Sequence, residues 1–95
     1  MKSTMMYRAQ GKEIDLSKIT RLYPAALVHS DGVSASVSLE WAEMKADKVS
    51  LEAYVLICDF DPVGEVPINR IELRYETKEE LLEAINVIAQ RMQTR

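Results

Sequence analysis

The chain has 95 residues, of which 47% are hydrophobic and 28% are charged, and its net charge at pH 7 is −3. This length suits a single domain, residues 1–95, with one apolar core. The charges are mixed in sign and the basic residues are not clustered, which argues against a nucleic-acid partner. The lone cysteine, Cys58, excludes an intramolecular disulfide and a cysteine-rich metal site. With no apolar run near the length of a membrane span and no signal-type segment before Arg8, we expect a cytoplasmic protein without a membrane partner.

The first third of the chain predicts two strands joined by a short turn. Residues 5–10 are expected to form a strand that reverses at Gly11-Lys12. Residues 15–18, with Asp15 as the cap, predict a single capped turn that leads into the next strand. That strand, residues 22–29, carries apolar side chains on both faces, a pattern typical of strands that are buried on both faces.

Asp31-Gly32 predicts a tight hairpin, because a two-residue turn with positive φ at both positions favours this pair. After the turn, apolar residues alternate with serines over residues 33–41, which predicts one long, half-buried strand. Residues 51–60 predict a further strand that is apolar on both faces. Its two sets are Leu51, Ala53, Val55 and Ile57 on one face and Tyr54, Leu56, Cys58 and Phe60 on the other.

The last third predicts a strand and the one long helix. A reversal at residues 61–64 precedes residues 68–76, where apolar side chains alternate with charged ones. The helix is expected from Thr77 to about Gln93, because Thr77 and Glu80 form a capping box and apolar residues follow at steps of three and four.

These elements predict an α+β fold: an antiparallel, strongly bent sheet of about five strands in meander order, packed by one C-terminal helix. The order resembles the layout of pleckstrin-homology-like domains, in which a strongly bent sheet is capped by a C-terminal helix. The resemblance is one of layout alone, without a shared motif, and it implies no function.

The residues that could carry chemistry are few, and we expect no catalytic residue and no cofactor. Asp59, Asp61 and Glu65 form an acidic cluster that could bind a hard cation, but the spacing does not match a calcium loop and a plain turn is the favoured interpretation. His29 is the only histidine, so a metal site built on it would lack partners.

The second apolar face of the sheet supplies the first functional hypothesis, a non-catalytic interaction module that forms a homodimer or binds a protein partner. The expected interface residues are Tyr23, Leu27, Tyr54, Leu56 and Phe60. Two copies could also join their sheets edge to edge. The alternative is a small-ligand or divalent-metal binding protein, or a weak enzyme, with a pocket near the loop that carries Asp59, Asp61 and Glu65 and with His29 as a further polar group.

Overall fold

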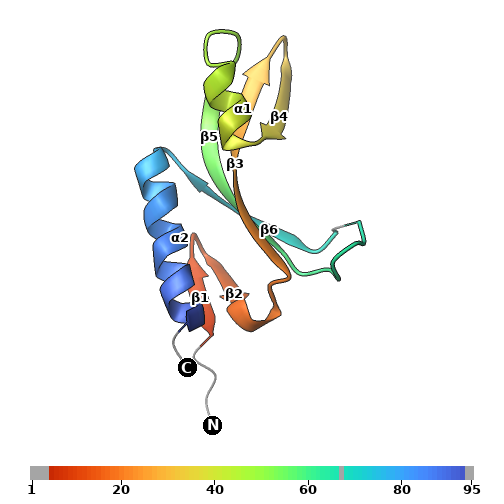
Figure 1. Cartoon of the computed structure of the whole chain (residues 1–95), viewed down its shortest axis with the longest axis vertical. Helices are drawn as coiled ribbons and strands as arrows, with labels where there is room; N and C mark the ends of the chain where they lie inside the picture. Colours follow the sequence, from red (N-terminus) through yellow and green to blue (C-terminus); the bar gives the residue numbers. More distant parts are fainter. Residues whose placement is uncertain (1–4, 67, 94–95) are drawn as a thin grey trace.

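A computed structural model of the chain describes residues 5–66 and 68–93 and shows an α+β architecture (Figure 1). The elements in chain order are β1 (Met6–Ala9), β2 (Lys12–Asp15), the 3₁₀ turn η1 (Leu16–Lys18), β3 (Arg21–Ser30), β4 (Val33–Val37), α1 (Leu39–Met44), β5 (Ser50–Asp59), β6 (Arg70–Tyr75) and α2 (Lys78–Gln93). The predicted antiparallel sheet and the C-terminal helix packed on it are confirmed.

The strand order differs from the expected meander. Four strands form an antiparallel sheet in the order β4-β3-β5-β6, and β1 and β2 form a separate two-stranded hairpin. Because β3 lies between β4 and β5, the chain leaves β4, crosses β3 through α1 and returns as β5. The sheet is not strongly curled, so the strong bend expected from the pleckstrin-homology-like layout is wrong.

The single long strand expected over residues 33–41 is also wrong. The strand ends at Val37, and Ser38 caps α1 through its hydroxyl, which accepts a hydrogen bond from the Trp41 N–H at 3.0 Å. β4 is not half-buried either, since Val33 is 65% exposed. Leu39, Ala42 and Ala46 line a cavity between α1 and the sheet. Leu39 and Ala42 are three residues apart on α1, and their contact with the sheet favours the helix over the serine alternation.

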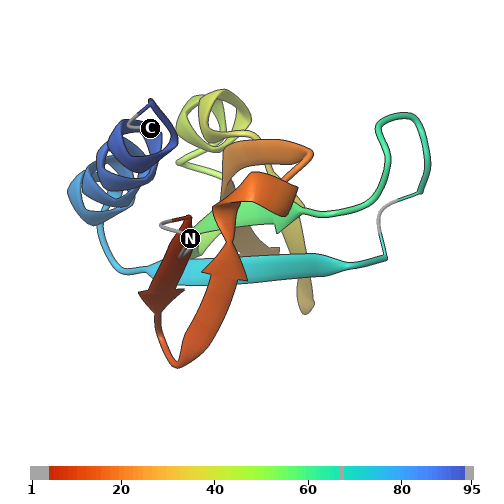
Figure 2. The ribbon, with the colours of Figure 1, turned by 90° about the horizontal axis from the view of Figure 1, so that it is seen from below.

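Both helices lie on one side of the sheet (Figure 2). On that side, α2 and the β1–β2 hairpin enclose the main core, whose buried members are Ile14, Leu16, Leu56, Cys58, Leu73, Leu81, Ala84 and Ile88. The predicted capping box is formed in part: the Thr77 hydroxyl accepts a hydrogen bond from the Glu80 N–H at 3.1 Å, while the Glu80 carboxylate accepts from the Glu76 N–H at 3.2 Å in place of the Thr77 N–H. The predicted tight hairpin is present as well, with φ values of 52° at Asp31 and 79° at Gly32.

Truncation of Leu56 tests the position of the core. Leu56 is fully buried beneath α2, so Leu56→Ala is expected to lower the free energy of unfolding by about 2–5 kcal/mol, from lost burial and the cavity left behind. Leu82 is 47% exposed on α2, and Leu82→Ala serves as the control with an expected change of about 0.5 kcal/mol or less. Urea unfolding of both variants measures the difference. Equal losses would contradict the packing described.

Candidate functional site

The register of β3 against β5 divides the five residues predicted as one interface. Tyr23 lies opposite Ile57, and Leu22 lies opposite Cys58. Because cross-strand partners share a face, Tyr23 and Leu56 lie on opposite faces of the sheet. Leu56 is fully buried beneath α2 and is not part of any surface. The five residues therefore do not form one continuous surface.

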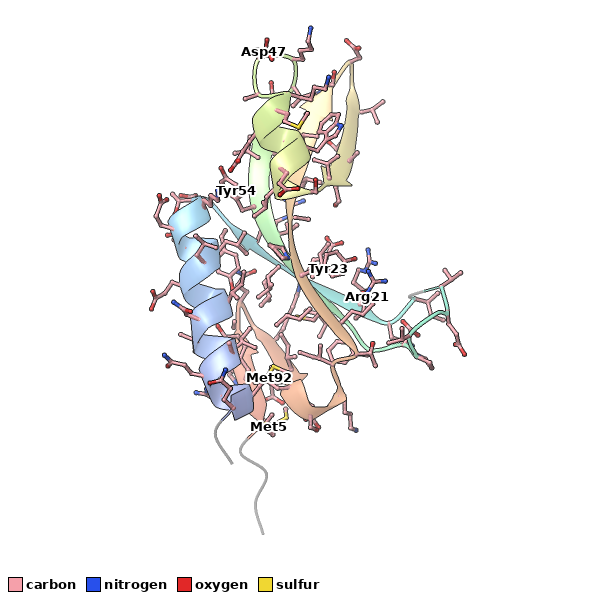
Figure 3. The ribbon with its side chains drawn as sticks, in the orientation of Figure 1. Met5, Arg21, Tyr23, Asp47, Tyr54 and Met92 are labelled. Carbon is pink, nitrogen blue, oxygen red and sulfur yellow. The ribbon has the colours of Figure 1, made fainter. Side chains whose placement is uncertain are left out.

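The other predicted interface residues follow the same division. Tyr54 and Phe60 are partly buried and pack against the main core on the helical side. Leu27 lies two residues after Ala25 along β3, so it shares a face with Ala25 and with Tyr23. Figure 3 shows Tyr54 beside the helices and Tyr23 and Arg21 on the other side of the sheet. The second apolar face is therefore built around Tyr23 and Leu27.

We call this second face, away from both helices, the open face. Ala25, Val55 and Ile57 form a small buried cluster there, and Tyr23 packs against it. Charged residues of β6 border the cluster, because Glu72 lies opposite Ile57 and Arg74 lies opposite Val55. A groove of 300 Å³ runs beside Tyr23 and is lined by Ala25, Ile57, Arg70 and residues 36–38. The open face thus joins an apolar floor to a charged border.

A buried ion pair closes one end of the open face. Asp59 is only 1% exposed, and its Oδ1 accepts a hydrogen bond from Arg70 Nε at 2.8 Å. This hydrogen bond raises the pKa of Arg70. Arg70 Nη2 also donates to the Tyr23 hydroxyl at 3.1 Å, and the Arg21 guanidinium lies over the Tyr23 ring, 5.2 Å from its centroid. Tyr23 is therefore held between two arginines.

The residues of the predicted ligand or metal site are not brought together. Asp61 organises the β5–β6 loop, because its carboxylate accepts hydrogen bonds from the backbone N–H groups of Asn69 and Ile68, both at 2.8 Å. These bonds, above all the one from Asn69, hold the pKa of Asp61 below its usual value. Glu65 is exposed on the same loop, and Asp59 is occupied by Arg70.

His29 is remote from these carboxylates, since it pairs with Ser50 at one end of β3 and Arg21 pairs with Asp59 at the other. Its Nδ1 lies 3.3 Å from the Ser34 hydroxyl and 3.4 Å from a Glu52 carboxylate oxygen. Within residues 5–66 and 68–93, there is no group of three side chains of histidine, cysteine, aspartate or glutamate that could hold a metal ion.

The outer edge of β6 is covered by side chains from the β1–β2 turn and the start of β2. The Gln10 amide donates to the Arg74 carbonyl at 2.6 Å and accepts from the Arg74 N–H at 3.0 Å. Lys12 Nζ donates to the Glu72 carbonyl at 3.0 Å. The Gln10 amide thus makes the pair of hydrogen bonds that a neighbouring strand would make.

The outer edge of β4 is different. In the part of the chain that the structure describes, β4 pairs only with β3, so its outer edge has no neighbouring strand. Its sequence, VSASV, contains no charge and no proline, and its first four residues are exposed. Charge, proline or a covering element usually blocks such an edge, and β4 has none of these.

Three residues with a role at these surfaces were missed in the sequence: Arg70, Gln10 and Lys12. Asp59 continues the alternation of Val55 and Ile57 on β5, so its burial, and the need for a cationic partner, could have been read from that pattern. Gln10 carries no such signal, since its partner Arg74 is 64 residues away.

No family model, curated protein or solved structure matches this chain. Among the described residues, no helix is long and apolar enough to cross a membrane.

Cys58 is expected to be unreactive in the folded protein. It is fully buried, and burial raises the pKa of its thiol to about 11. A thiol reagent at pH 8 should therefore label Cys58 only at the rate of unfolding. Unfolded chains release this proton near pH 9, so the native state loses stability as the pH rises from about 9 to about 11. Urea unfolding between pH 8 and 10 should show a smaller loss for Cys58→Ala, and an equal loss would contradict the assignment.

The Asp59–Arg70 pair is open to a double-mutant test. Arg70→Met leaves a buried carboxylate without its cation and is expected to lower the free energy of unfolding by at least about 2 kcal/mol. Adding Asp59→Asn to Arg70→Met should recover part of this loss, because the uncompensated charge is removed. Arg74→Met, on the same strand and face, is the matched control. If Arg70→Met costs no more than Arg74→Met in urea unfolding, the ion pair contributes nothing to stability.

Proposed function

We propose that the protein is a non-catalytic protein-interaction module that acts as a homodimer. The observation that carries the proposal is the uneven covering of the sheet. The helices cover one face and Gln10 and Lys12 cover the β6 edge, while the open face and the β4 edge have no layer or strand against them in the described residues. An unpaired strand edge is a feature through which sheets associate, and the partly buried side chains of Tyr23 and Leu27 add apolar surface on the adjoining open face.

The arrangement of the polar residues supports a binding role over a catalytic one. Asp59 and Asp61 are engaged in structural hydrogen bonds, and Cys58 is buried with a raised pKa. A nucleophile needs an adjacent base and an orienting group, and these side chains are instead used to fix strands and loops.

The small-ligand alternative keeps one observation in its favour, the groove beside Tyr23 with the Arg70 guanidinium in its wall. Its volume of 300 Å³ is at the low end for ligand pockets. A small anion bound there would raise the melting temperature by mass action. Inorganic phosphate and acetate are suitable probes, and Arg70→Met should abolish the shift.

The homodimer is tested by the solution mass of the native protein. Light scattering over a concentration series should approach twice the monomer mass of 10.8 kDa. The mass should change little between low and high salt, because β4 itself contains no charged residue. A mass of 10.8 kDa at every concentration would contradict the proposal.

A further inference from the structure

We infer that the second copy binds along the outer edge of β4, antiparallel, about a two-fold axis that passes beside Ala35. This inference rests on the proposed homodimer and specifies its partner surface and its register. The two four-stranded sheets would then become one continuous sheet of eight strands.

The hairpin geometry identifies the backbone groups that β4 offers. Asp31 and Gly32 have positive φ, as a two-residue turn requires, and Ser30 lies opposite Val33. Such a turn is closed by a hydrogen bond from the Val33 N–H to the Ser30 carbonyl. Because bonding alternates along an antiparallel pair, Val33, Ala35 and Val37 bond to β3, and the N–H and C=O groups of Ser34 and Ser36 point outward.

The sequence of β4 is self-complementary about Ala35. Residues 33–37 read VSASV in either direction. In an antiparallel pair centred on Ala35, Ser34 meets Ser36 of the second copy, and Val33 meets Val37 of the second copy. The Ser34 and Ser36 pairs are the hydrogen-bonded ones in this register, so every outward backbone group finds a partner. The outward groups and the sequence symmetry thus select the same centre.

The surroundings of β4 leave room for a second strand. Ala35 is exposed and small, so the close approach of two copies at the axis places no bulky side chain between them. No charge lies in the strand, so pairing opposes no like charges. α1 packs over β3, and Val28, Leu51 and Tyr54 line the cavity beneath it, so the helix turns away from the edge.

The other routes to sheet pairing are less favourable. Pairing along β6 would have to displace the hydrogen bonds of Gln10 and Lys12. β4 has no such competitor on its outer edge in the described residues. A contact of five residues is small for a specific interface, so the mass should depend on concentration.

Disulfide cross-linking tests the register. Only residue 35 meets its own copy, and a non-hydrogen-bonded pair brings its Cα atoms to about 4.5 Å, within reach of a disulfide. Ala35→Cys should therefore convert almost completely to a covalent dimer under mild oxidation. Ser34→Cys is the matched control and should remain largely uncross-linked, because its copy lies at a diagonal position. A mixture of Ser34→Cys and Ser36→Cys should form the mixed dimer. Cys58 is buried and should not interfere.

A charge variant separates this inference from the homodimer itself. Ala35→Lys places two like charges at the axis and should reduce the mass to 10.8 kDa without lowering the monomer's stability, since Ala35 is exposed. If the native protein is monomeric, the homodimer proposal fails. If it is dimeric but Ala35→Lys remains dimeric and Ala35→Cys cross-links no faster than Ser34→Cys, the β4 pairing is wrong and the homodimer stands.

Discussion

The fold depends on β5, the strand that pairs with β3 on one side and β6 on the other. It carries apolar side chains on both faces, and Val55, Leu56, Ile57 and Cys58 are all at most 2% exposed. In the described residues, helices lie against one of these faces only. On the other face, shielding comes from neighbouring side chains such as Tyr23, which packs on Ile57, and Arg70, which borders the groove. The open face exists because β5 is apolar on both faces while helices cover only one of them in the described residues.

The ion pair between Asp59 and Arg70 shields one end of the face that has no helices against it. Asp59 lies on the same face of β5 as Val55 and Ile57, so its carboxylate is buried where an apolar residue would be expected. Arg70 stands opposite it at the start of β6 and reaches the Tyr23 hydroxyl as well. One guanidinium thus links all three strands that form the floor of the open face, at the end next to the β5–β6 loop. Removing it would loosen the tyrosine as well as expose a charge.

Local patterns in the sequence predicted the elements that local forces determine. The Asp31-Gly32 turn and the Thr77 cap of α2 each depend on residues within one turn, and both are present. The alternation over residues 33–41 misled because Leu39 fits both the strand pattern and the helical spacing of Leu39 and Ala42. Contact with the sheet decides in favour of the helix. The division of the five interface residues between two faces has another cause. Whether Tyr23 pairs with Leu56 or Ile57 is a matter of register, and a shift by one residue moves a side chain to the other face.

The open face and the β4 edge are physically connected, because Ser36 and Val37 belong to both. These two residues end β4, and they also line the groove beside Tyr23. A strand bound along β4 would fix the backbone of Ser36. Because Ser36 lines the groove, the groove would then change shape less readily. Antiparallel pairing about a two-fold axis perpendicular to the sheet keeps like faces on the same side. The two grooves would then flank the axis on a common surface, with both pairs of helices behind it. An occupant of that surface would contact both copies and would in turn favour the paired state, since coupling between sites acts in both directions.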